Sequence, residues 1–249
     1  MRILLFQIRN LGDPMLGQEF ECFRSKLAAS GTQISFVLES HNIIENQNGY
    51  DKVWKSYDAV IVGGSGDYGC VDNNEPWFSY FCGVLRNIVA SKKPLFCSCF
   101  GHQALATALG GKVSTDRERS ELGTFEVSVN EEGRRDELFG NLYPSFKAQF
   151  GHNDFVSELP VGAVNLASTP LCAVQAYRLE GRLCYATQFH PELSHLENQE
   201  RAMNYLAIYS RNRMDPKELD IVSQPSIKAS ELLPRFMEMV AAQTFCTEK

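Results

Sequence analysis

Residues 93–103 read Lys-Pro-Leu-Phe-Cys-Ser-Cys-Phe-Gly-His-Gln, a short apolar run followed by small and polar residues. We interpret them as a strand that enters a sharp turn, with a helix over 104–109 on the far side. A nucleophile at the tip of such a turn is presented to substrate, and the positive end of the next helix stabilises a thiolate. Cys99 is therefore the candidate nucleophile, and Gly101 is expected to let the backbone bend without a Cβ clash.

A second stretch supplies a base for this cysteine. Residues 185–192, Tyr-Ala-Thr-Gln-Phe-His-Pro-Glu, form an apolar-rich run that ends in His190-Pro191-Glu192. In extended backbone, residues two apart project to the same side, and a proline biases the residue before it toward that geometry. His190 and Glu192 are thus expected to point into one cleft, with the histidine as base and the glutamate orienting it. With Cys99 they form the predicted catalytic triad.

Glycines follow a third apolar run. Residues 58–62 are expected to form a buried strand that runs into Gly63-Gly64-Ser65-Gly66. Glycine lets backbone N–H groups approach a ligand closely, so this loop is suited to bind a developing negative charge. The predicted oxyanion hole consists of the backbone N–H groups of Gly64, Ser65 and Phe100.

Strand and helix signals alternate along the first 110 residues, which predicts a mostly parallel sheet covered on both faces. Strands are expected at 2–8, 33–38, 58–63 and 94–98, and helices at 17–30, 77–91 and 101–110. Five strand signals then follow without helices between them, near 124–129, 147–150, 163–167, 172–178 and 183–189, and a helix is expected at 196–210. We therefore predict an α/β fold with a doubly wound, mostly parallel sheet and a small antiparallel β extension.

The chain changes character after Arg211. A polar, proline-punctuated link is followed by apolar residues at helical spacing, namely Leu232, Leu233, Phe236, Met237 and Val240. We predict one domain over 1–210 and a helical extension over 211–249 packed on the same domain. A dimer contact or a lid is the alternative for this helix, and the segment is too short for a synthetase or other acceptor domain.

Composition limits the function classes. The chain has 249 residues, 44% of them hydrophobic, and a formal net charge of −6. The apolar content suffices for one large domain, and the negative charge leaves no basic footprint for nucleic acid. No apolar run approaches the ~18 residues that span a membrane. The eight cysteines are scattered as in a reduced, cytoplasmic enzyme, and Cys97-x-Cys99 alone is a poor metal site. We expect a cytoplasmic protein without metal or cofactor that binds neither nucleic acid nor a membrane.

Taken together, these motifs resemble those of class I (triad) glutamine amidotransferases over roughly residues 40–206. The elbow over 99–103, the glycine pair 110–111 at the end of the next helix and the His-x-Glu pair at 190–192 occur in the order of that family. Cys97 stands where the family usually has glycine, and residues 63–66 replace a common Gly-Gly-Pro. The resemblance implies a flavodoxin-like fold.

The resemblance also implies contacts with substrate. Residues 121–123 lie where family members contact the α-amino and carboxylate groups of glutamine, and residues 152–154 resemble their Ser-His-x-Asp segment. The implied substrate-binding residues are Gln103, Glu121, Leu122, Gly123, His152 and Asp154. From the residues alone, His102 and His152 are better explained as structural histidines that shape the pocket.

The implied activity is hydrolysis of the glutamine side-chain amide through a Cys99 thioester, with ammonia passed to a synthetase on another chain. Pro76-Trp77 after the glycine loop is similar to free-standing members that resemble the amidotransferase part of GMP synthetase. One alternative is a stand-alone hydrolase of γ-glutamyl peptides or conjugates, because the same thioester chemistry serves them. The alternative from another class is a non-catalytic interaction module, against which the complete triad argues. A homodimer is the other assembly that we consider.

Overall fold

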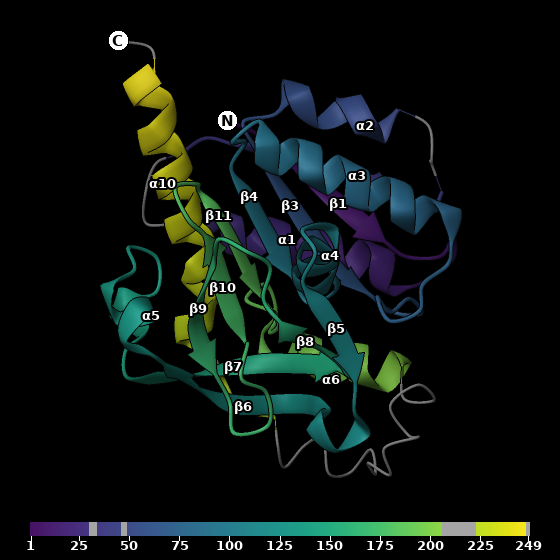
Figure 1. The fold of residues 1–249 in the computed structure, drawn as a ribbon, viewed down its shortest axis with the longest axis vertical. Coiled ribbons are helices and arrows are strands. Elements are labelled where there is room, and N and C mark those ends of the chain that lie inside the picture. Colours follow the sequence, from purple (N-terminus) through teal and green to yellow (C-terminus); the bar gives the residue numbers. More distant parts are fainter. Residues whose placement is uncertain (30–33, 46–48, 206–222, 248–249) are drawn as a thin grey trace.

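The computed structural model describes residues 1–29, 34–45, 49–205 and 223–247. Its main sheet contains β1 (Arg2–Ile8), β2 (Val37–Asn42), β3 (Ala59–Ser65), β4 (Leu95–Ser98), β6 (Glu121–Val129), β7 (Ser145–His152), β9 (Ala163–Ser168), β10 (Ala176–Leu179) and β11 (Cys184–Thr187). These nine strands lie in the order β2-β1-β3-β4-β11-β10-β9-β6-β7 (Figure 1). A separate two-stranded sheet pairs β5 (Lys112–Thr115) with β8 (Asp154–Glu158).

One half of the main sheet is parallel and covered on both faces. β2, β1, β3, β4 and β11 pair in parallel. Successive residues of β1 enter opposite cores, Leu4 and Phe6 on one face and Ile3 and Leu5 on the other. The helices involved are α1 (Met15–Ala28), the short α2 (Tyr50–Val53), α3 (Pro76–Ala90) and α4 (Phe100–Ala108). α3 and α4 pack on the first face and α1 on the second, which confirms the predicted doubly wound α/β core (Figure 1).

The antiparallel half continues the same sheet. β10 pairs with β11 and β9, and β6 pairs with β9 and β7, all antiparallel. The predicted extension is therefore present, but it is joined to the core rather than separate. The prediction was wrong for the strand near 183–189, because β11 runs parallel to β4 and belongs to the core. β2 begins at Val37, later than the predicted 33–38, and the short β5 and β8 were not predicted.

The C-terminal helix packs on this chain's own core. α9 (Ile227–Ser230) leads into α10 (Leu232–Thr247), whose predicted apolar residues lie in the cluster that also contains Phe23 and Leu27 of α1. The ring of Phe236 lies 5.4 Å from that of Phe96 on β4. Because Phe96 is on the strand that leads to Cys99, α10 supports that strand from behind. The predicted boundary at 210/211 lies outside the described residues.

The predicted helix over 196–210 is α6 (His195–Asn204), and residues 206–210 lie outside the described part. α6 begins with a capping box in which Ser194 and Glu197 bond to each other's backbone N–H groups. This cap fixes the start of a helix that directly follows the His190–Glu192 segment.

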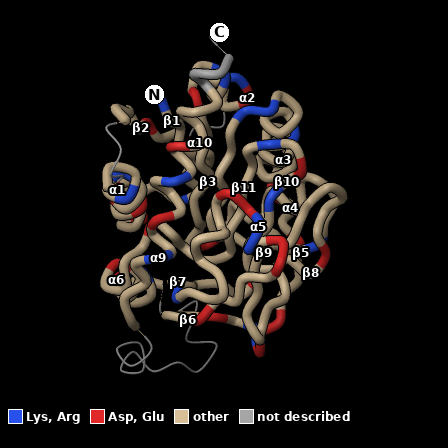
Figure 2. Tube along the Cα trace, turned by 90° about the vertical axis from the view of Figure 1, so that its left-hand side faces the viewer, with Lys and Arg blue, Asp and Glu red and all other residues tan. Residues whose placement is uncertain are grey.

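Charged residues are interspersed along the described trace rather than gathered on one element (Figure 2). Among the described helices, none is both long and apolar enough to cross a membrane.

Candidate active site

Cys99 lies at a strained turn between β4 and α4. Its φ of 51° and ψ of −103° are unusual for a residue with a side chain, and it is 6% exposed. The prediction that Gly101 makes the bend was wrong. Gly101 instead allows close packing, because a Cβ there would lie 2.8 Å from the backbone oxygen of Val62 on β3. The strain is carried by Cys99 itself.

His190 and Glu192 lie just beyond the carboxyl end of β11, the parallel neighbour of β4. The Nδ1 atom of His190 lies 2.7 Å from Oε1 of Glu192, and both side chains are buried. The segment forms a turn after the strand rather than the extended backbone that the spacing predicted, with the N–H of Leu193 bonded to the carbonyl of His190. The N–H of His190 also donates to the carbonyl of Gln149 on β7 at 2.8 Å. Backbone contacts therefore hold the imidazole in place.

The charges in this pair reinforce each other. Burial opposes a charged imidazole, but the negative charges of Glu192 and of Cys99 as a thiolate, with hydrogen bonds to both, raise the pKa of His190 to about 9. Burial alone would raise the pKa of Glu192, yet His190 and then Arg201 lower it to about 2. The carboxylate therefore stays ionised and favours a protonated His190 beside Cys99.

Two residues that the sequence analysis missed complete the surroundings of Glu192. Nη1 of Arg201 lies 3.2 Å from Oε1 of Glu192, and the hydroxyl of Ser98 donates to Oε2 at 3.0 Å. Arg201 comes from α6, and Ser98 directly precedes Cys99. Only the position of Ser98 beside the elbow offered a signal in the sequence.

Polar groups also surround the sulfur. Nε2 of Gln188 lies 3.8 Å from Sγ of Cys99, and the thiol lies 3.8 Å from the carbonyl oxygen of Gly151. Gln103 donates through Nε2 to the backbone oxygen of Asp154 and to the side chain of Gln188, so it supports the wall of the site. By contrast, burial raises the pKa of the neighbouring Cys97 thiol well above its usual range, which keeps Cys97 protonated.

The predicted oxyanion loop is only partly available. The N–H of Gly64 donates to Oε1 of Glu19 on α1 at 3.0 Å. This corrects the prediction for Gly64, because a bonded N–H cannot also bind an oxyanion. Glu19 is fully buried and paired with Arg9 at 2.9 Å. Ser65 and Phe100 remain as candidate donors, and the first N–H groups of a helix such as α4 have no partner within the helix.

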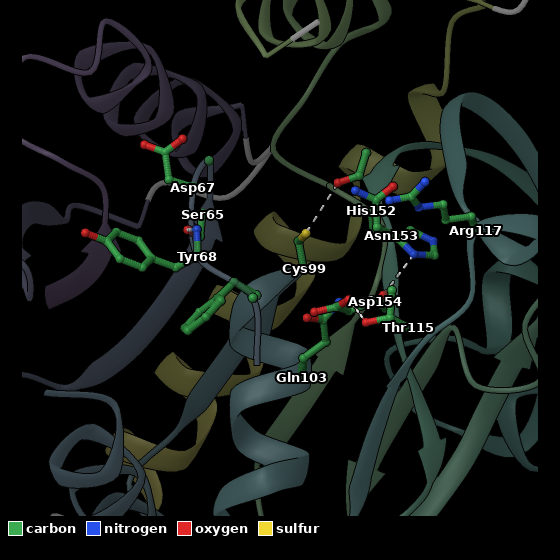
Figure 3. A pocket seen from close by; sticks show the side chains of 14 residues that line it. Ser65, Asp67, Tyr68, Cys99, Gln103, Thr115, Arg117, His152, Asn153 and Asp154 are labelled. Carbon is green, nitrogen blue, oxygen red and sulfur yellow. Dashed lines mark hydrogen bonds between the residues drawn. The ribbon is translucent and has the colours of Figure 1, made fainter. Parts of the chain in front are cut away.

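A pocket of about 290 Å³ opens beside Cys99. Residues 65–69 line one side, and Thr115, Arg117 and residues 151–154 line the other (Figure 3). Phe100 and Gln103 also line it. The pocket is therefore bounded by the glycine loop, the elbow and the segment that joins β7 to β8.

Of the implied substrate contacts, Gln103, His152 and Asp154 line this pocket, whereas residues 121–123 are not among its lining residues. The side chain of Glu121 is fully buried, with Oε2 2.9 Å from Nε2 of His152. The carbonyl of Gly123 accepts from Asn198 of α6. The prediction that residue 121 meets substrate through its side chain is thus corrected: Glu121 holds His152 from behind.

The two histidines near the pocket differ in state. Burial lowers the pKa of His102 to about 3, so it stays neutral, and its ring lies 4.9 Å from that of Tyr177. Nδ1 of His152 faces the backbone oxygen of Asp154 at 3.0 Å. Glu121, His152 and Cys172 have potential metal-ligand atoms within 4.8 Å of one another. Direct bonding between Glu121 and His152 fills that cluster, and we assign no metal to it.

The fold and the site together define an α/β protein with a candidate cysteine nucleophile at a strand–helix elbow. The family model described as glutamine amidotransferase class-I matches residues 21–208. One chain of a glutamine-hydrolysing GMP synthase built from separate subunits, from Methanococcus vannielii, is 31% identical over 74% of this chain and 87% of its own length. A glutamine-hydrolysing GMP synthase from Caldicellulosiruptor saccharolyticus is 41% identical over 45% of this chain, but only 22% of its length is covered.

A solved glutamine amidotransferase from Thermotoga maritima has the same fold, with a TM-score of 0.74 at 18% identity over 96% of this chain and 97% of that one. This chain therefore belongs to the class I glutamine amidotransferase family. It spans most of the Methanococcus vannielii relative, but only about a fifth of the longer synthase from Caldicellulosiruptor saccharolyticus.

Proposed function

We propose that this chain hydrolyses the side-chain amide of L-glutamine, with Cys99 as nucleophile, His190 as acid and base, and Glu192 orienting the imidazole. The observation that carries the proposal is the strained Cys99 beside a buried His190–Glu192 pair whose charges favour an imidazolium. Family membership supports the same chemistry.

The proposed reaction has two halves. The Cys99 thiolate forms a C–S bond to the amide carbon, and the carbonyl electrons move to oxygen, where the N–H groups of Ser65 and Phe100 donate to them. His190 gives its proton to the nitrogen as the C–N bond breaks and ammonia leaves. Water then attacks the thioester while His190 removes its proton, and glutamate leaves as the Cys99 thiolate is restored.

The larger pocket would hold the amino-acid end of glutamine. The Asp154 carboxylate at its edge is fixed by the hydroxyl of Thr115 at 2.6 Å and is suited to the α-ammonium group. The exposed Arg117 guanidinium lines the same pocket and matches the α-carboxylate. His152 would shape this wall, because Glu121 holds its ring.

We further propose that the ammonia serves a synthetase on a separate chain. The relatives from Methanococcus vannielii and Sulfurisphaera tokodaii support this, because each is named as one subunit of a GMP synthase and so as one part of an assembly. The described residues form a single amidotransferase fold around one main sheet.

The test is glutamate release from glutamine by the wild-type chain and by Cys99→Ala. We expect the variant to lose at least ~10³-fold in kcat, because a nucleophile has no substitute in this scheme. Cys22→Ala removes another buried thiol, on α1, and is expected to keep activity. Undiminished glutaminase activity in Cys99→Ala would overturn the proposal.

A further inference from the structure

A second, much smaller cavity lies on the other side of Cys99. Its volume is about 10 Å³, and His190, Leu122, Ala202 and Tyr205 are among the residues that line it. Ser65 and Gly151 line both this cavity and the larger pocket, so the two spaces meet at the catalytic cysteine. The candidate triad therefore separates a large space from a small one.

The small cavity is on the side of the leaving group. A general acid must be within hydrogen-bond reach of the atom it protonates. His190 lines the small cavity and is absent from the described residues that line the larger pocket. The glutamyl part of the substrate then occupies the larger pocket, and the departing nitrogen faces the small cavity.

Size decides what can leave on this side. A cavity needs about 10–15 Å³ of this volume to hold one water molecule, and ammonia is of similar size. The amine of a γ-glutamyl peptide carries a whole amino-acid residue, which this space cannot hold. A primary amide is therefore the substrate class that fits.

Tyr205, at the end of α6, is the wall that can be identified most clearly. Its hydroxyl donates to Oδ2 of Asp13 at 2.5 Å and accepts from Nη1 of Arg9. Its ring is packed so closely on the glycine loop that a Cβ on Gly66 would lie 2.4 Å from it. Arg9 also pairs with Glu19, which binds the N–H of Gly64. The wall and the glycine loop are thus held by one buried network.

We propose that Tyr205, pinned by Arg9 and Asp13, is a specificity-determining residue that limits the leaving group to ammonia and excludes γ-glutamyl peptides. This inference rests on the proposed glutaminase function and narrows its substrate class. Leu122, on β6, forms another part of the same wall and is 5% exposed. Removing either side chain is expected to make room for a larger amine.

The experiment compares kcat/KM for L-glutamine, γ-glutamylmethylamide and γ-glutamylglycine. We expect the wild-type chain to prefer glutamine over γ-glutamylglycine by at least ~100-fold, in line with loss of a substrate that cannot be seated. Tyr205→Ala is expected to reduce that preference at least tenfold, with the methylamide gaining first. Met203→Ala removes a side chain that is 48% exposed on the same helix and is expected to leave the ratio unchanged.

The outcomes separate the two proposals. No wild-type turnover of any of the three substrates contradicts the proposed function itself. Wild-type turnover of γ-glutamylglycine as efficient as that of glutamine overturns the specificity proposal alone. So does an unchanged ratio in a folded Tyr205→Ala. If Tyr205→Ala does not fold, as judged by circular dichroism, Leu122→Ala gives the same comparison, and an unchanged ratio there also overturns the proposal.

Discussion

At the scale of single residues, reactivity depends on a strained backbone and a charge held in the interior. A non-glycine residue with positive φ, as at Cys99, stores about 1–3 kcal/mol, which the surrounding structure must offset. Glu192 receives Arg201 and Ser98 as well as His190, so its negative charge is kept despite full burial. These contacts turn a buried histidine into one that is protonated at neutral pH.

Glu192→Gln tests this electrostatic account. His190 must be protonated for ammonia to leave, so the raised pKa predicts that kcat/KM of the wild type holds at neutral pH and falls above about pH 9. Removing the carboxylate charge leaves burial as the dominant effect and lowers the pKa of His190. The alkaline limb is then expected to move to lower pH, and kcat to fall by ~10²–10⁴-fold.

The measurement is a pH–rate profile of glutamate release by both proteins, with the exposed Glu180→Gln as control. An alkaline limb at the same pH in wild type and Glu192→Gln would contradict the proposed role of Glu192.

Local sequence predicted some of these residues and could not predict others. Cys99 and the His190-Pro191-Glu192 motif are short patterns, and the structure brings their side chains together. Arg201 and Glu19 reach the site from helices far away in sequence, through contacts that no spacing encodes. Glu19 is therefore the reason that the oxyanion prediction was wrong at Gly64.

At the scale of elements, the position of the elbow depends on how closely α4 packs on β3. Helix and strand boundaries around the elbow matched the sequence prediction because an apolar strand and a helix start are local signals. The pairing of β11 with β4 was not predictable in the same way, because the direction of a strand is set by its distant neighbour. The short β5 and β8 show little apolar alternation and so gave no signal.

Gly101→Ala tests the importance of this packing. The new Cβ would lie 2.8 Å from the backbone oxygen of Val62 and 2.9 Å from its side chain, so α4 must move away from β3. Overpacking of this kind typically costs about 1–3 kcal/mol of stability. Because Cys99 immediately precedes α4, glutaminase activity is expected to fall as well.

Gly83→Ala on α3 is the matched control. The nearest atom to its new Cβ is the end of the flexible Arg86 side chain at 3.6 Å, and alanine favours a helix over glycine by up to about 1 kcal/mol. Urea unfolding of both variants checks the prediction. Equal stability changes in the two proteins would show that close packing at Gly101 is unimportant.

At the scale of the whole molecule, the last helix buttresses the strand that presents the nucleophile. α10 comes from the far end of the chain, yet Phe236 packs on Phe96, three residues before Cys99. The apolar spacing of α10 was evident in the sequence. Its docking site was not, because an amphipathic face shows only that a helix is covered and not by what.

Phe236→Ala is expected to destabilise the protein by ~3–5 kcal/mol, because it leaves a cavity in a fully buried cluster. Ile227→Ala on α9, where the side chain is 74% exposed, is expected to change stability by less than ~0.5 kcal/mol. The measurement is the shift of the urea midpoint in the full chain. If the two substitutions have the same small effect, α10 does not support the core as described.

The most direct test of the central claim is to trap the acyl-enzyme. The wild-type chain is mixed with L-glutamine, quenched in acid and digested, and the peptides are weighed by mass spectrometry. We predict one γ-glutamyl group on the peptide that contains Cys99, absent in Cys99→Ala and retained in Cys22→Ala. A γ-glutamyl group on another residue, or glutamate release with no adduct on Cys99 at any quench time, would contradict nucleophilic catalysis by Cys99.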